Sequence, residues 1–312
     1  MIFHYLKIAF RNLCKHKTQN IISIIGLAVG LLCFCVCIYC SRFVESTDHC
    51  FANHDRIAEL NLYDGKADRY FSGSPVPLAE ELRTWALGET EAISSVTYPR
   101  ERPYYVELSP EKTLPYELET IEIDTCYNKI FTPEMVAGHW QVASQSLNSV
   151  ILSQSMAIKI FGNAESAIGK HMTLMRRLNT SPESTPKTGG IVYTIQAVMK
   201  DIPLNNSLDF MQNIDMLTVN DSEGLLQSPK RHNMTGANTY VLLSPQTTCT
   251  DLEKQFSKRD YTYTLYDEAY TVTASNMGSR LKKQGASYLG LVTGTVGTLI
   301  LLVGLINFFH FL

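Results

Sequence analysis

The stretch KTQNIISIIGLAVGLLCFCVCIYCSR, residues 17–42, decides how the rest of the chain is organised. Between Lys17 and Arg42 it contains no Asp, Glu, Lys or Arg. In a helix, about 20 apolar residues with a rise of about 1.5 Å each match the roughly 30 Å hydrocarbon core of a bilayer. The stretch therefore predicts a transmembrane helix, which we place at residues 19–41.

A cleaved signal peptide is the alternative interpretation of this stretch. The apolar region of a signal peptide is typically about 7–15 residues long and is followed by a small-residue cleavage site. Here the apolar run is longer and ends in Val36-Cys37-Ile38-Tyr39-Cys40, without such a site. An uncleaved membrane anchor fits these features better.

Charge differs sharply between the two sides of the apolar stretch. Four basic residues precede or begin it, namely Lys7, Arg11, Lys15 and Lys17, and Glu45 is the first acidic residue of the chain. Loops rich in Lys and Arg stay in the cytoplasm. The N-terminus is therefore expected in the cytoplasm, and the chain after residue 41 on the other side of the membrane.

The first 18 residues have a pattern of their own. Lys7, Arg11 and Lys15 recur at four-residue steps, and apolar residues recur between them at helical spacing. Such a helix lies in the membrane interface, with its basic face, completed by Lys17, toward anionic lipid. A simple basic flank of the membrane span is the alternative.

The exported part of the chain is acidic. All 30 Asp and Glu residues of the 312-residue chain lie between Arg42 and Lys283, with 23 of the 27 Lys and Arg residues, so this part has a net charge of −7. Nucleic acid is not expected as a partner, because binding to phosphates needs a basic surface. Three of the eight cysteines lie here, Cys50, Cys126 and Cys249, and their spacing leaves open whether two of them form a disulfide.

Short β-like and helix-like runs alternate irregularly through the exported part. Period-two patterns and turn residues predict strands at 56–62, 67–71, 93–98, 104–108, 119–123, 148–152, 191–199, 239–243 and 261–274. Capping and stop signals predict helices at 75–87, 153–161 and 249–256. The stretch 176–190 is rich in Ser, Thr, Pro and Gly and predicts a mobile loop. Without a regular βαβ rhythm, this mixture indicates an α+β domain.

A second apolar run occupies residues 284–312 and predicts another transmembrane helix at 286–312. Gly290 and Gly294 are one helical turn apart, as are Gly26 and Gly30 in the first run, and such pairs favour close packing of membrane helices. Asn307 is the strongly polar residue of the second run and is expected to bond to another helix. The chain stops at Leu312 without a basic flank, which is typical of a fragment of a longer protein.

Two segments superficially look like chemical sites. Residues 161–171 contain Gly162, Gly169 and Lys170, but the glycine spacing and the residue after the lysine do not match a phosphate-binding loop. Residues 48–55 contain Asp, His and Cys without the paired spacing of a zinc site, and a solvated segment is the stronger interpretation. We therefore expect no catalytic, cofactor-binding or metal residue in this chain, and no enzymatic activity.

The chain resembles the N-terminal part of MacB/FtsX-like ATP-binding-cassette (ABC) transporter permeases. The similarity is ordered and covers nearly the whole sequence. The segments that carry it are Leu6–Leu13, Ile24–Gly30, His54–Ile57, Val150–Ala157, Phe161-Gly162, Ile168–Lys170, Tyr193–Val198, Asp201–Pro203 and Leu305–Phe308. Ala58 and Glu59 depart from the aromatic and basic residues usual in that family.

The resemblance implies an architecture. It predicts a cytoplasmic interfacial helix at 1–18, a first transmembrane helix at 19–41, an α+β periplasmic core domain of two lobes at 42–283, and a second transmembrane helix at 286–312. The protein would be a multi-pass protein of the bacterial inner membrane, with its N-terminus in the cytoplasm and its large domain in the periplasm. It would form a homodimer or one half of a pseudo-dimeric permease.

The resemblance also implies a function. A partner ABC ATPase subunit would hold ATP and magnesium, and its ATP hydrolysis would move the periplasmic domain for export or mechanotransmission. A periplasmic adaptor, an outer-membrane channel and membrane lipid are the other implied partners. A membrane-anchored sensor with a ligand-binding extracytoplasmic domain is the alternative. The sequence does not identify a transported substrate.

Overall fold

The computed structural model describes most of the chain from residue 17 to residue 310. The described residues are 17–71, 73–85, 87–109, 111–174, 190–208, 213–222, 224–227, 235–265, 267–279 and 287–310. They belong to two compact units, one of Met1–Thr47 with Ser279–Leu312, and the other of Asp48–Gly278. The helix predicted at 1–18 and the loop predicted at 176–190 lie almost entirely outside the described residues.

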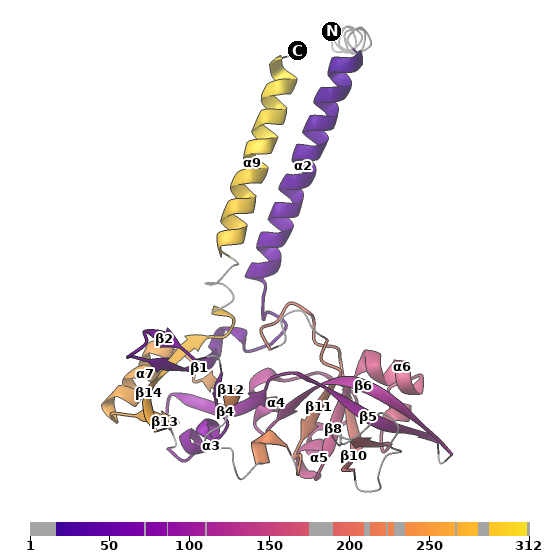
Figure 1. The fold of residues 1–312 in the computed structure, drawn as a ribbon, viewed down its shortest axis with the longest axis vertical. Coiled ribbons are helices and arrows are strands. Elements are labelled where there is room, and N and C mark those ends of the chain that lie inside the picture. Colours follow the sequence, from indigo (N-terminus) through magenta and orange to yellow (C-terminus); the bar gives the residue numbers. More distant parts are fainter. Residues whose placement is uncertain are drawn as a thin grey trace. The chain divides into compact units, whose positions relative to one another are not determined.

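Two antiparallel helices, α2 (Lys17–Glu45) and α9 (Ser287–His310), form the described part of the first unit (Figure 1). In α2, Ile24–Glu45 has a mean hydropathy of 2.5 and is long and apolar enough to cross a membrane, whereas the described apolar segment of α9 is shorter, Gly294–Val303. A helix suits a bilayer because its backbone N–H and C=O groups bond to each other. Helices thus occupy both ranges in which transmembrane helices are predicted, and α2 extends beyond 19–41 at both ends.

The second unit is built on one 14-stranded sheet. Its strands are β1 (Ile57–Asp64), β2 (Arg69–Tyr70), β3 (Ser74–Pro75), β4 (Thr90–Thr97), β5 (Arg100–Ser109), β6 (Lys112–Ile123), β7 (Met135–Gly138), β8 (Ser149–Ser153), β9 (His171–Leu174), β10 (Val192–Met199), β11 (Met216–Val219), β12 (Thr235–Leu243), β13 (Thr262–Leu265) and β14 (Glu268–Asn276). The main order is β11-β8-β10-β9-β5-β6-β4-β12-β1-β14-β13, and β2, β3 and β7 pair with β1, β12 and β10. Only β8–β10 and β6–β11 are parallel among the described pairs.

The pairing of β11 with β6 closes part of this sheet on itself. Strands β11, β8, β10, β9, β5 and β6 thereby form a closed ring, and side chains from every one of them meet in one core. That core includes Tyr104, Leu118, Leu152, Met172 and Met216. We call these six strands, with helix α6 (Gln154–Phe161), the ring half of the unit.

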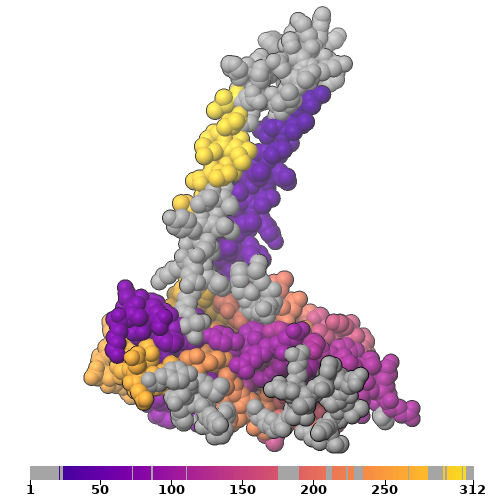
Figure 2. Space-filling model, in the orientation of Figure 1, coloured from indigo at the N-terminus to yellow at the C-terminus, as the bar shows by residue number. Residues whose placement is uncertain are grey.

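Strands β4, β12, β1, β14 and β13, with β2 and β3, form the flank half together with α3 (Leu78–Arg83) and α7 (Cys249–Lys258), whereas β7 is attached to β10 of the ring half. Its core includes Leu60, Leu82 and Phe256. Strands of both halves, with α4 (Tyr127–Phe131) and α5 (Trp140–Gln145), share a third core that joins them. On the surface, the β1–β2 hairpin adjoins the β13–β14 hairpin, where Lys66 Nζ lies 3.4 Å from Glu268 Oε1 (Figure 2).

Local sequence signals located many of these elements. Ser153 caps α6 by accepting the Met156 N–H, and Gly162 ends the helix with a φ of 85°. Thr248 caps α7 in a capping box with Asp251. The helix predicted at 75–87 is shorter, because Ser74–Pro75 (β3) pairs with β12 instead. The short elements α4, β7, α5, β9 and β11 were not predicted, yet the α+β fold class is confirmed.

The two ends of the second unit lie side by side. β1, the first strand, pairs antiparallel with β14, the last long strand, from Ala58 opposite Asn276 onward. The N–H of Met277 donates to the carbonyl of Ile57 at 2.9 Å. The chain therefore enters and leaves this unit through neighbouring strands of the flank half.

Candidate functional site

A cleft opens where two parallel strands end. β6 and β11 pair with Ile123 opposite Val219, so residues 124–125 and 220–221 leave the sheet at the same edge. The carboxyl ends of parallel strands are a common position for binding sites. The cleft has a volume of about 230 Å³ and is lined by Val76, Glu80, Arg83, Ser95, Glu122, Ile123, Asp124, Thr125, Asn220, Asp221, Leu226 and Gln227.

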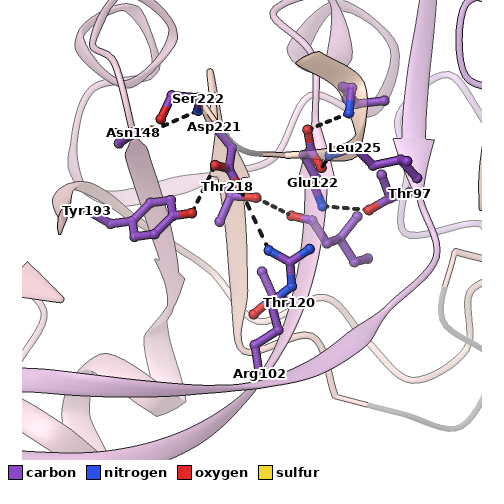
Figure 3. Close-up of polar contacts among 12 residues, drawn as sticks. Thr97, Arg102, Thr120, Glu122, Asn148, Tyr193, Thr218, Asp221, Ser222 and Leu225 are labelled. Carbon is purple, nitrogen blue, oxygen red and sulfur yellow. Dashed lines mark hydrogen bonds and ion pairs between the residues drawn. The ribbon is translucent and has the colours of Figure 1, made fainter. Parts of the chain in front are cut away.

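Glu122, near the end of β6, is only 3% exposed. Its carboxylate accepts the backbone N–H of Leu225 at 2.6 Å and that of Leu226 at 2.8 Å (Figure 3). Gly224 permits this approach, because a Cβ there would lie 2.1 Å from the Glu122 Oε1. Burial raises the pKa of Glu122 to about 7, although the two N–H groups lower it. Glu122 thus fastens the segment after β11 to β6.

Asp221, just after β11, is almost fully buried. The Tyr193 hydroxyl donates to its Oδ1 at 2.9 Å, and Arg102 Nη1 lies 3.7 Å from its Oδ2 (Figure 3). Burial and the charge of Asp221 raise the pKa of Tyr193, so the hydroxyl keeps the proton that it donates. A buried ion pair contributes little net stability, but losing one partner is costly. This network therefore fixes how β5, β10 and the end of β11 meet.

Asp124, the residue after β6, organises the other wall of the cleft. Its carboxylate accepts the Ser94 hydroxyl at 2.7 Å and the backbone N–H groups of Ser95 and Cys126 at 3.0 Å, and it pairs with Arg83. These contacts tie α3, β4 and the start of α4 to the end of β6. Charge-assisted hydrogen bonds of this kind are about twice as strong as neutral ones.

Three of the four carboxylates that line the cleft are thus engaged in holding the fold. Glu122, Asp124 and Asp221 each accept hydrogen bonds from other parts of the unit. Among the residues that the structure describes, no group of three or more His, Cys, Asp or Glu side chains is placed to hold a metal ion. We interpret the cleft as a structural junction between the two halves.

The glycine pairs predicted to pack helices have different surroundings. A Cβ on Gly30 would lie 3.3 Å from Ile300 of α9, whereas one on Gly26 or Gly294 would meet none of the described atoms within 4 Å. In α9 the close contact falls instead at Gly297, whose Cβ would lie 3.2 Å from Cys37 Sγ. Within one chain, the helices therefore approach each other at Gly30 and Gly297, and packing at the other glycines stays a prediction for contacts between copies.

The remaining predicted residues are only partly described. Gly290 and Asn307 lie in α9, and Lys17 is the first residue of α2, but their surroundings lie outside the description. The basic residues Lys7 and Arg11, like Lys15, precede the described part of the chain.

Residues 48–55, the other segment considered for metal, have structural contacts. Asp48 accepts hydrogen bonds from Ser207, and the rings of His49 and His54 lie 4.4 Å apart. Burial, reinforced by the charge of Asp48, raises the pKa of the Cys50 thiol to about 11, which disfavours the thiolate that metals and electrophiles need. Cys50, Cys126 and Cys249 are free thiols.

Residues 161–171, which superficially look like a phosphate-binding loop, form a connection within the ring half. The Asn163 side chain accepts the Ser166 N–H at 2.7 Å, and the Gly169 N–H donates to the Ile195 carbonyl at 2.8 Å. Lys170 donates its backbone N–H to Ala167 at 3.1 Å. This segment connects α6 to β9 and leads the chain back to the sheet.

Three residues have dense polar contacts that the sequence did not reveal: Glu122 and Asp221 were not singled out, and Asp48 belongs to the segment 48–55, which was expected to be solvated although Asp48 is only 2% exposed. Glu122 follows a period-two pattern, Glu119 to Ile123, that places it on the polar face of its strand. That pattern predicts an exposed side chain. The partners of Asp48 and Asp221 lie far away in the sequence, so no local signal marks them.

Comparison with known proteins identifies the family. Residues 21–259 match the family described as MacB-like periplasmic core domain, which covers more than half of the 312-residue chain. The chain therefore belongs to the MacB-like periplasmic core domain family, and the resemblance to MacB/FtsX-like ABC transporter permeases is confirmed. No curated protein matches the chain.

Solved structures are similar to this chain, and one with a TM-score above 0.5 supports the fold. A domain described as that of a permease protein from Porphyromonas gingivalis has a TM-score of 0.53 and 21% identity, and the match covers 73% of this chain and 93% of that structure. The periplasmic region of MacB from Actinobacillus actinomycetemcomitans has a TM-score of 0.45 and 13% identity, with 74% and 92% covered. Membership of this family, together with the apolar helix α2, identifies the chain as an inner-membrane protein with a periplasmic domain.

Proposed function

We propose that this chain is the permease subunit of an ABC transporter, in which ATP hydrolysis by a cytosolic partner moves the periplasmic domain for export or mechanotransmission. The observation that carries the proposal is the pairing of β1 with β14 in a MacB-like core domain. These strands continue toward α2 and α9 along the chain. Along the chain, both helices therefore lead to neighbouring strands of the periplasmic domain.

The topology follows the distribution of charge. The N-terminus would be cytoplasmic, with Lys7, Arg11, Lys15 and Lys17 facing anionic lipid, and both α2 and α9 would span the inner membrane. The permease would act as a homodimer or as half of a pseudo-dimer. A periplasmic adaptor and an outer-membrane channel would be further partners.

The partner ATPase would supply the ATP and magnesium site, and this chain would hydrolyse no ATP itself. Purified alone, the chain should show no ATP turnover above background, whereas the complex isolated from its own membrane should show turnover. Turnover by the isolated chain that is lost on changing Lys170 would contradict the proposal.

Fusions test the topology. A reporter that needs export, inserted at Ser181, should be active, and a reporter that needs the cytoplasm should be inactive there. The sensor alternative predicts the same exported domain, but a signalling protein in place of an ATPase in the isolated complex. The 230 Å³ cleft is smaller than the roughly 300–1,000 Å³ typical of ligand pockets, so it does not favour the sensor.

A further inference from the structure

The chain that leaves α2 is fastened to the ring half before it reaches the sheet. Asp48 follows the last residue of α2 by three positions and is only 2% exposed. Its carboxylate accepts the Ser207 N–H at 2.6 Å and the Ser207 hydroxyl at 2.9 Å. Its own N–H donates to the Asn205 carbonyl at 3.1 Å. Both partners lie between β10 and β11 of the ring half.

The backbone of Asp48 indicates that these bonds determine its conformation. Its φ is 71°, in the left-handed region that residues other than glycine seldom adopt. Such a conformation persists where surrounding contacts impose it. The following turn adds one more contact, in which the Phe51 N–H donates a hydrogen bond to the Asp48 carbonyl at 3.0 Å.

The described part of the β10–β11 connection that contains Ser207, residues 200–208, is itself attached to the ring half. The Asp201 side chain accepts the Ser155 N–H of α6 at 2.9 Å. Leu208, next to Ser207, is buried in the shared core with Phe51, so polar and apolar contacts reinforce each other. A displacement of Asp48 would therefore act on α6, β10 and β11 together.

We propose that Asp48 is a coupling anchor: through Ser207 it makes the ring half follow the end of α2, which otherwise continues directly only into the flank half through β1. This inference rests on the proposed function, because it names the contact by which helix movement reaches one half of the periplasmic domain. Asp48 is a positioning residue and takes part in no chemistry.

The first experiment tests the anchor without any ATPase. Hydrogen exchange is measured on the whole chain in lipid nanodiscs, for wild type, Asp48→Asn and Ser207→Ala. Asp48→Asn replaces a charged acceptor by a neutral one, whose hydrogen bonds are about half as strong, so it should speed exchange of the Ser207 amide about tenfold. Asp55→Asn, in the same segment but with a side chain 89% exposed, is the matched control and should leave the rate unchanged. An unchanged rate in Asp48→Asn would overturn the anchor.

The second experiment tests coupling in the complex with the ATPase that co-purifies with the chain. Wild type should show an ATP-dependent change of exchange in both halves. Ser207→Ala and Asp48→Asn should lose that change in α6, β10 and β11 and keep it in β1 and β14, and Ser207→Thr, which retains the hydroxyl, should restore it. A merely structural role would not produce this selective loss.

The outcomes separate the two ideas. If wild type shows no ATP-dependent change in either half, the proposed function is wrong, while the first experiment still decides whether Asp48 holds the connection. If wild type responds and the variants respond equally in both halves, the proposed function stands and the coupling role of Asp48 is wrong.

Discussion

Replacing Glu122 by Gln should change how the stability of the periplasmic domain depends on pH. Burial raises the pKa of this carboxyl from 4.5 to about 7 in the folded protein. Between these two values, the folded state keeps a proton that the unfolded state has released. The free energy of unfolding contributed by Glu122 is therefore fully present below about pH 4.5 and is lost as the pH rises through 7.

The magnitude of this effect on stability follows from the size of the pKa shift of Glu122. At about 1.36 kcal/mol for each pH unit, the range from 4.5 to about 7 corresponds to a loss of about 3 kcal/mol in wild type. Glu122→Gln has no proton to release and should lack this part of the slope. The amide cannot accept both N–H bonds of Leu225 and Leu226, so the variant should also be less stable by a constant amount of about 1–3 kcal/mol. The change of the free energy of unfolding with pH reports the ionisation of Glu122, and the constant difference between wild type and variant does not.

Urea denaturation at several pH values from 4.5 to 8, followed by tryptophan fluorescence, measures both quantities. Both tryptophans, Trp85 and Trp140, lie in the second unit and report its unfolding. Glu117→Gln is the matched control, because Glu117 lies on the same strand with an exposed side chain. Parallel curves for wild type and Glu122→Gln would refute the raised pKa. A wild type that gains stability relative to the variant as pH rises would mean that the two N–H bonds outweigh burial.

Further predictions concern helix packing, the ring network and a cap. Gly30→Leu should weaken the contact between α2 and α9 by about 1–3 kcal/mol, whereas Gly26→Leu should not, as measured by crosslinking within one chain from cysteines placed in the two helices. Arg102→Met should cost about 3–5 kcal/mol in urea denaturation, because it removes the ion-pair partner of the buried Asp221. An equal cost for Arg102→Met and for the double variant with Asp221→Asn would argue against an ion pair. Thr248→Ala should cost about 1 kcal/mol through loss of the α7 cap, and no change in the urea midpoint would contradict this.

Local chemistry made part of the fold predictable. The cap at Thr248 and the left-handed glycine at Gly162 depend on neighbouring residues only, so the helices that they delimit were located from the sequence. The turn at Asp64-Gly65 likewise follows β1, and its carboxylate accepts the N–H of Lys66 at 2.9 Å. These signals need no knowledge of the tertiary structure.

The ring closure could not be predicted, and it explains why Glu122 is buried. β6 and β11 pair between residues 120–123 and 216–219, so the contact leaves no trace in either segment alone. A polar residue that alternates with Ile121 and Ile123 predicts a sheet with one solvated face. Closing the ring buries that second face as well, and Glu122 becomes a buried carboxylate that needs internal donors.

Ring closure also bears on how a displacement would spread through the domain. An open sheet has edge strands that can shift with few contacts, as at β13 in the flank half. A closed ring has no edge strand, because each of its six strands is hydrogen-bonded on both sides. In addition, the contacts of Arg102, Tyr193 and Asp221 join β5, β10 and the end of β11. A force applied at the β10–β11 connection is therefore shared by the whole ring rather than absorbed by one strand. That rigidity is what a single anchor at Asp48 would require in order to move half of the domain.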